Sequence, residues 1–148
     1  MQNRYVRRAL VMSMVAFLIA CGSSVAPGAP DVNGSWMLSM SNLTATGINC
    51  TESGMTLNLS STGGGNFTGT YSGGTYVCTT STETDTLQIG SGPVTDGGVA
   101  GNLVAFDLGT SDSPFSGQFS AGSMSGTASI QIGQQTLNGN WQANRPTQ

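Results

Sequence analysis

The 148-residue sequence predicts an all-β fold, an antiparallel up-and-down meander that closes into a small barrel of eight or nine strands. Three observations lead to this prediction. Apolar and polar residues alternate with a period of two, no segment shows sustained helical periodicity, and turn residues recur at short intervals. A β-sandwich is the alternative architecture that these observations leave open.

Four alternating segments predict strands at residues 55–60, 104–108, 124–132 and 136–143. In each of them one face is apolar and the other is polar, which is typical of antiparallel sheets with one buried face. Segments rich in glycine, asparagine and aspartate predict the turns between strands. We place these turns at residues 63–66, 73–74, 96–98 and 112–114.

A pattern of apolar, any, glycine, any, apolar recurs six times and favours a barrel over a sandwich. It occurs at Val32-Gly34-Trp36, Phe67-Gly69-Tyr71, Val99-Gly101-Leu103, Phe115-Gly117-Phe119, Met124-Gly126-Ala128 and Leu137-Gly139-Trp141. By alternation each glycine lies on the inward face, where the missing side chain lets a strand coil tightly. A sheet that coils at many inward positions closes on itself, and closure removes exposed strand edges.

The N-terminal residues are typical of a secretory signal. Arg4, Arg7 and Arg8 precede an apolar run over residues 9–20 that only Ser13 interrupts. This run is shorter than a transmembrane helix requires, and small residues follow it. We therefore expect residues 1–20 to be a signal peptide.

The end of this run, Leu18-Ile19-Ala20-Cys21, resembles the lipobox of bacterial lipoproteins. The resemblance implies that the thiol of Cys21 is diacylglycerated, that the signal is cleaved before it, and that the new amino terminus is acylated. Residues 21–30, rich in serine, glycine and proline, would then be a flexible tether. Residues 31–148 would form the barrel domain. In a Gram-negative cell, Gly22 in place of aspartate favours the outer membrane.

The two remaining cysteines predict a structural disulfide. With Cys21 taken by lipid, Cys50 and Cys78 are the only possible pair in an oxidising compartment. Such a bond stabilises the fold by about 3–4 kcal/mol in the chain-entropy model. We expect no metal site, because the chain has no histidine to supply ligands.

The charge balance argues against nucleic-acid binding. Once the signal is removed, Arg145 is the remaining basic side chain, against seven acidic ones. Neither nucleic-acid phosphates nor anionic lipid headgroups attract such a surface. Membrane association is therefore expected to come from the acyl chains.

The residues of the common catalytic groups are missing. Without histidine or lysine the chain cannot build a Ser-His-Asp triad or a Ser-Lys dyad. Residues 122–126 carry Met124 where a nucleophile elbow needs serine. Glu83 and Asp85 lie in a wholly polar stretch that predicts a solvated loop. We expect a protein that is not an enzyme and uses no cofactor.

Four aromatic residues form the candidate ligand-binding set: Trp36, Tyr71, Phe115 and Trp141, all predicted to face inward. A barrel of about eight strands either fills its interior with side chains or holds one small ligand. Plain packing is the alternative role for each residue. Tyrosine and tryptophan also carry a polar group that a buried site must satisfy.

Two families of small barrels are similar to the chain at these residues. The segments 34–36, 67–71, 115–119 and 137–141 resemble, in this order, strand signatures of the avidin and streptavidin group. By this resemblance Tyr71, Phe115 and Trp141 correspond to biotin-facing positions. Leu38 stands where that family contacts the ureido group of biotin through a polar side chain. The resemblance therefore implies the barrel rather than biotin binding.

The second resemblance is to lipocalin-like bacterial protease inhibitors, some of which are outer-membrane lipoproteins. They too begin with a Gly-x-Trp strand, here at residues 32–40, and have a cysteine before the next strand, as Cys50 is here. That cysteine pairs with a later one, as Cys78 could. In that family the segment ahead of the barrel inserts into the protease cleft, and residues 23–32 are its counterpart.

These patterns together predict a lipid-anchored protein of the cell envelope with a non-enzymatic binding role. The expected partners are the membrane, through the N-terminal acyl chains, and a small apolar ligand in the barrel. A secreted protease is the alternative partner. A purely structural surface lipoprotein, with a barrel filled by its own side chains, is the third possibility.

Overall fold

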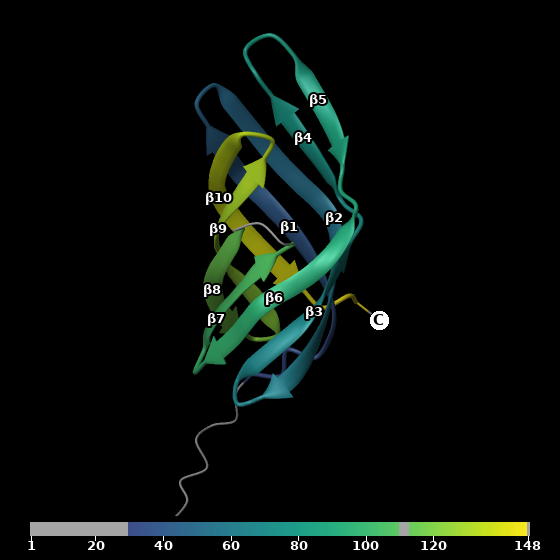
Figure 1. The fold of residues 1–148 in the computed structure, drawn as a ribbon, viewed down its shortest axis with the longest axis vertical. Helices are drawn as coiled ribbons and strands as arrows, with labels where there is room; N and C mark the ends of the chain where they lie inside the picture. Colours follow the sequence, from purple (N-terminus) through teal and green to yellow (C-terminus); the bar gives the residue numbers. More distant parts are fainter. Residues whose placement is uncertain (1–29, 110–112, 148) are drawn as a thin grey trace, which may run out of the picture.

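The computed structural model describes residues 30–109 and 113–147. In this part of the chain ten strands form one antiparallel sheet (Figure 1). The strands are β1 (Gly34–Ala45), β2 (Ile48–Gly63), β3 (Asn66–Ser72), β4 (Thr75–Thr79), β5 (Thr84–Gln88), β6 (Ser91–Ala100), β7 (Leu103–Leu108), β8 (Pro114–Ser120), β9 (Ser123–Ile132) and β10 (Gln135–Asn144). The predicted signal peptide, Cys21 and nearly all of the predicted tether lie outside the described residues.

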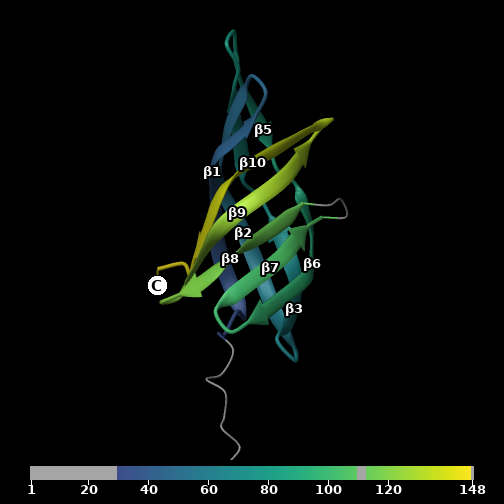
Figure 2. The ribbon, with the colours of Figure 1, turned by 90° about the vertical axis from the view of Figure 1, so that its left-hand side faces the viewer.

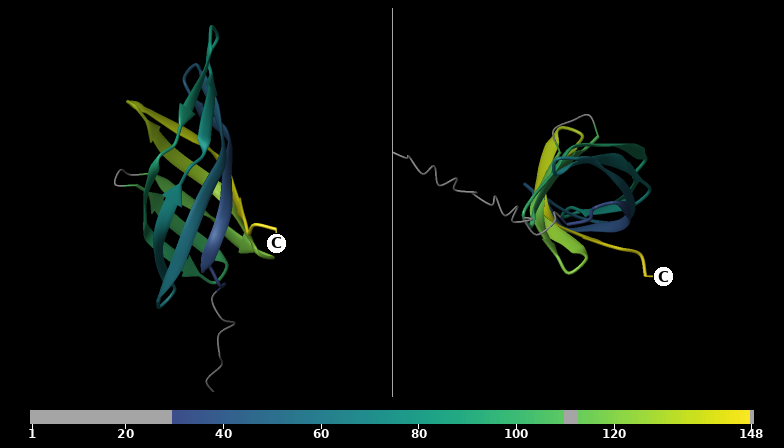
Figure 3. Two further views of the ribbon diagram at one scale, coloured as in Figure 1. Left: turned by 90° about the vertical axis from the view of Figure 1, so that its right-hand side faces the viewer. Right: turned by 90° about the horizontal axis from the view of Figure 1, so that it is seen from below.

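Eight of these strands close into a barrel. Their order around the ring is β1, β2, β3, β6, β7, β8, β9 and β10, and β10 pairs back onto β1 (Figure 2). Figure 3 shows the same ring along its axis. The predicted all-β meander that closes into a barrel is confirmed, and the alternative of a sandwich is wrong. The described part of the chain contains no helix long and apolar enough to span a membrane.

The two remaining strands form a hairpin outside the ring, which we call the arm (Thr75–Gln88). Strand β2 pairs with β4 over its first part, Asn49–Ser53, and with β3 over its second part, Thr56–Gly63. The arm therefore continues the wall of the barrel beyond one end (Figure 1). The predicted disulfide is confirmed, since Cys50 of β2 bonds to Cys78 of β4 and ties the arm to the barrel.

The predicted alternation places the apolar residues in the interior. All four segments identified in the sequence are strands whose apolar faces point into the barrel. The buried apolar set is Val32, Trp36, Leu38, Met40, Leu43, Cys50, Met55, Leu57, Leu59, Phe67, Val94, Val104, Phe106, Leu108, Phe115, Met124, Ala128, Ile130, Leu137, Trp141 and Ala143. This continuous core supplies the main driving force for folding.

The inward glycines allow neighbouring strands to approach closely. At Gly69, Gly117, Gly126 and Gly139 an added Cβ would collide with backbone atoms of an adjacent strand. These positions confirm the interpretation that glycine permits tight coiling of the barrel wall. The same interpretation is wrong for Gly101, which has φ of +62° in the turn between β6 and β7, so its periodic spacing is coincidental. It is also wrong for Gly34, which is exposed at the start of β1 with φ of +103°.

Two of the predicted turns and loops are also corrected. Residues 96–98 lie inside β6 as a β-bulge, where Asp96 has φ of +51° and the register with β7 shifts. A bulge and a turn both select small residues and positive φ, so the sequence alone does not separate them. The predicted loop around Glu83 and Asp85 is the exposed turn of the arm together with the start of β5. The turns at 63–66 and 73–74 are as predicted. The predicted turn at 112–114 lies partly outside the described residues, and its last residue, Pro114, begins β8.

Candidate functional site

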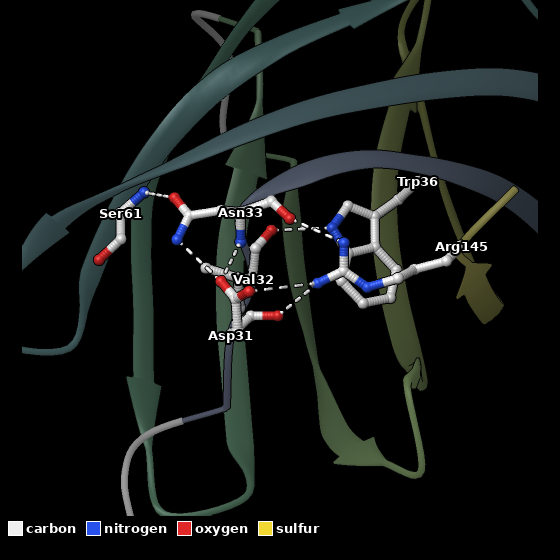
Figure 4. Close-up of polar contacts among 6 residues, drawn as sticks. All are labelled: Asp31, Val32, Asn33, Trp36, Ser61 and Arg145. Carbon is white, nitrogen blue, oxygen red and sulfur yellow. Dashed lines mark hydrogen bonds and ion pairs between the residues drawn. The ribbon is translucent and has the colours of Figure 1, made fainter.

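The two ends of the barrel differ, and the end at which β1 begins is closed by the segment Asp31–Asn33. Arg145, just after β10, clamps this segment (Figure 4). Its Nη1 donates to the carbonyl of Asn33 and its Nη2 to the carbonyl of Asp31, both at 2.8 Å. The guanidinium also lies 4.3 Å from the centre of the Trp36 ring, a cation–π contact. We call this the closed end.

Polar groups at the closed end are matched with partners. The indole N–H of Trp36 donates to the carbonyl of Val32 at 2.8 Å, and the side chain of Asn33 accepts from the amide of Ser61 at 2.7 Å (Figure 4). The backbone and side-chain N–H groups of Asn33 both donate to the Asp31 carboxylate, which holds its pKa below the ordinary value. These hydrogen bonds hold the segment Asp31–Asn33 in place across this end of the barrel.

The middle of the barrel is filled by aromatic rings. Phe106 and Phe115 stack with their centres 4.9 Å apart, and Trp141 meets both rings edge-on, at 5.3 and 5.8 Å. The indole N–H of Trp141 donates to the carbonyl of Ser116 at 3.1 Å. The interior at this level is a packed core, with the polar atom of the tryptophan satisfied by backbone.

The structure therefore separates the four predicted ligand-binding residues. Trp36, Phe115 and Trp141 lie in the packed interior, each no more than 2 % exposed. Tyr71 is half-buried and lines a cavity at the opposite end of the barrel from Arg145. Of the four, Tyr71 is the one that lines this cavity, while Trp141 also borders a hollow of about 430 Å³ on the outer wall of the barrel.

That cavity occupies the mouth of the barrel beside the arm, which we call the open end. Its volume is about 440 Å³, within the usual range for small-molecule sites. The wall combines apolar side chains with the two tyrosine rings and some backbone. It is formed by Met55, Tyr71, Tyr76, Ile89, Ser91, Gly92, Pro93, Leu108, Gly109, Ser113, Ile130 and Gln131.

A buried acid lies directly behind this wall. Glu52 is only 2 % exposed, and its Oε1 accepts a hydrogen bond from the amide of Met55 at 3.0 Å. Its Oε2 is also buried and has no hydrogen-bond partner among the described residues. Burial raises the pKa of Glu52 to about 7, against the opposing effect of the amides of Met55 and Met40. A buried carboxyl oxygen without a partner is costly, which marks this position as a candidate functional group.

Residues of the cavity wall also surround the Glu52 carboxyl. Tyr76 lies directly opposite Glu52 in the pairing of β2 with β4. The pKa of Tyr76 is raised, first by burial and then by the charges of Glu52 and Tyr71. A Cβ on Gly74 would lie 2.6 Å from Oε1 of Glu52 and 3.2 Å from Cδ1 of Ile89. The carboxyl thus lies beside residues of the cavity wall, bonded to the backbone of Met55 and opposite Tyr76, without lining the cavity itself.

Alternation in the sequence does not reveal Glu52 as an inward residue, because a bulge separates it from the alternating residues that begin at Met55. The predicted strand began at Met55, whereas β2 begins at Ile48 and continues through Gly54, which has φ of +84°. The bulge adds a residue, so the inward positions before it are not in phase with Met55. The available signal was the spacing of two between Glu52 and the disulfide-forming Cys50, which places both on the same face.

A smaller hollow of about 220 Å³ lies beside the segment Asp31–Asn33 at the closed end. The others lie on the outer wall of the barrel. The largest, about 850 Å³, runs over β6 to β9 and is lined by glycine, serine, threonine and other uncharged residues. It is a wide surface depression, without the buried polar group that distinguishes the open end. Among residues 30–109 and 113–147, no group of three or more acidic, cysteine or histidine side chains is placed to hold a metal ion.

Comparisons of the chain with models of protein families, with curated proteins and with solved structures found no significant match.

Proposed function

We propose that this protein is a lipid-anchored binding protein of the cell envelope, without enzymatic activity, that holds a small ligand at the open end of its barrel. The observation that carries the proposal is the asymmetry of the two ends. One end is plugged and its polar groups are paired, while the other has a cavity with a buried, half-partnered acid behind it. The wall of this cavity mixes apolar side chains with polar groups, and a site for a small molecule likewise uses apolar contacts together with a few polar groups that orient the ligand.

The location of the ligand differs from the one expected from the sequence. Trp36, Phe115 and Trp141 support the barrel from within, and Tyr71 is the member of that set that would contact the ligand. A ligand at the mouth leaves the aromatic core intact, so binding requires no rearrangement of the barrel.

The proposed anchor rests on the lipobox-like residues 18–21 of the sequence. It places the barrel in the envelope, on the outer membrane in a Gram-negative cell. Substitution of Cys21→Ser should abolish labelling by a radioactive fatty acid and release the protein from the membrane fraction. If the variant still sediments with membranes and the wild type incorporates no lipid, the anchor is disproved.

Native mass spectrometry of the protein purified from its own envelope tests ligand binding. We expect an additional mass of a few hundred daltons, roughly that of a drug-sized ligand, which is lost on denaturation. Ile89→Trp, which fills the cavity, should remove this mass, whereas Val77→Trp on the exposed face of the arm should retain it. A wild type free of any additional mass, or an Ile89→Trp variant that keeps it, would contradict a ligand at the open end.

A further inference from the structure

The cavity and the acid behind it indicate the chemistry of the ligand. Glu52 is the one buried charged side chain among the described residues. Met55, Leu108 and Ile130 line the cavity beside it with apolar groups, and two tyrosines, two serines and a glutamine add polar ones. A site with this composition suits a molecule with an apolar body and a single polar end.

The charged residues of the protein decide which polar group of a ligand can bind at the open end. Arg145 is the single basic side chain of the described residues, and it is engaged at the closed end. The open end therefore has no cation to pair with the carboxylate or phosphate of a ligand. A protonated amine, in contrast, supplies N–H donors for the unpartnered Oε2 of Glu52 and a positive charge for aromatic faces.

We propose that the open end binds the ammonium group of a small amphiphilic amine. Oε2 of Glu52 accepts one of its N–H groups, the rings of Tyr71 and Tyr76 flank the cation, and the apolar part fills the remaining cavity. Because Glu52 is not part of the cavity wall, binding includes a rotamer change of Met55 or Ile89. Both line the cavity; the amide of Met55 bonds to the carboxyl, and Ile89 and the carboxyl both lie close to Gly74. This inference rests on the proposed function and names its ligand class.

The site also predicts how binding depends on pH. The described titratable groups beside Glu52 are Tyr76 on β4 and, next to it, Tyr71 on β3, while on β1 it is paired with Met40. Glu52 is the group at this site that titrates near neutrality, with a pKa of about 7. A cationic ligand favours the ionised carboxyl, so affinity for an amine should rise as the pH rises through this value.

Isothermal titration calorimetry with three probes of equal chain length tests the inference. Octylamine, octanol and octanoate are titrated into the mature chain, residues 21–148, with Cys21→Ser to prevent lipidation. This chain retains all ten strands and the closed ring of the barrel. An alkylamine stays protonated from about pH 5.5 to about pH 8.5, so a change in its affinity over this range reports on the protein.

We expect octylamine to bind roughly tenfold more tightly than octanol at about pH 8.5, the gain of one charge-assisted contact. This advantage should disappear at about pH 5.5 and in Glu52→Gln. Glu83→Gln, which neutralises an exposed carboxyl on the arm, is the matched control and should bind octylamine like the wild type.

Equal binding of octylamine and octanol, with loss of both in Ile89→Trp, would overturn the amine specificity and leave the proposed function standing. Preferential binding of octanoate would likewise overturn it. If none of the three probes binds, both the inference and the binding site at the open end are wrong. The comparison of probes on the wild type stands even if Glu52→Gln does not fold.

Discussion

The two ends of this barrel differ in how completely their polar groups are paired. At the closed end, a short segment packs across the opening, and Arg145 satisfies two of its carbonyls while covering Trp36. At the open end, the arm extends the wall but leaves a cavity, and Glu52 keeps a buried oxygen without a partner. Polar groups that serve only stability are expected to be paired when buried. The contrast supports the proposal that the closed end is structural and that the open end binds a ligand.

Removal of the Trp36 side chain from the closed end should destabilise the protein more than any other change considered below. Trp36→Ala deletes a fully buried side chain together with its hydrogen bond to Val32, and should lower the free energy of unfolding by about 3–5 kcal/mol. Urea denaturation followed by circular dichroism measures the loss. Trp36→Phe, which keeps an aromatic ring, should lose much less. A loss below about 1 kcal/mol for Trp36→Ala, the level of a surface substitution, would show that this end is not packed as described.

The disulfide should be the main stabilising element of the open end. Replacement of both Cys50 and Cys78 by serine frees the arm from a cross-link that spans 28 residues, and should cost about 3–4 kcal/mol. Reduction of the wild type should reproduce this loss in the same denaturation assay. A wild type whose stability does not respond to a reductant would argue against the bond.

Glu52 should make the stability of the protein fall with rising pH. Its pKa is raised from 4.5 to about 7 in the folded chain, so the folded state binds the proton more tightly than the unfolded state. The corresponding stability is complete below about pH 4.5 and is lost as the pH rises through about 7, by roughly 3 kcal/mol in total.

Urea denaturation at several pH values checks this dependence. Glu52→Gln should be insensitive to pH across the same window and more stable than the wild type above it, because glutamine has no proton to lose. Glu83→Gln should keep the dependence of the wild type. Identical pH profiles for Glu52→Gln and the wild type would show that Glu52 is not buried as described.

The clamp at the closed end should depend on the shape of Arg145 more than on its charge. Arg145→Lys keeps the charge but loses the planar fork that reaches both carbonyls, and should cost about 1 kcal/mol. The ion pair with Asp31 is exposed, with a distance of 3.9 Å, and should add little. High salt should therefore leave the wild type nearly unchanged. If high salt destabilised the wild type as much as Arg145→Lys does, the ion pair with Asp31, and not the two hydrogen bonds to carbonyls, would be what holds the segment.

The sequence predicted the wall of the barrel and the cross-link to the arm, but not how its two ends are built. Alternation identified the strands from Val104 to Ala143, because each has one buried face. The inward glycines predicted the tight coil of the wall, and the two cysteines predicted the cross-link. These features depend on local patterns that a strand imposes on its own residues.

The open end depends on irregularities that local patterns do not reveal. The arm has little buried surface, and β5 is exposed along its whole length, so its residues show no alternation. The bulge at Gly54 puts Glu52 out of phase with the strand that follows. Gly74, in the turn between β3 and β4, approaches the Glu52 carboxyl of β2, and only the folded chain brings these two residues together.

A chemical-shift map of the mature chain in the presence of octylamine tests the central claim most directly. Nuclear magnetic resonance spectra of the amide groups, recorded during the titration, locate the ligand without any substitution in the barrel. The account predicts the largest shifts at Glu52, Met55, Tyr71 and Tyr76, and none at Asn33 or Arg145. Shifts centred on the closed end or on the outer wall, with the open end unchanged, would contradict it.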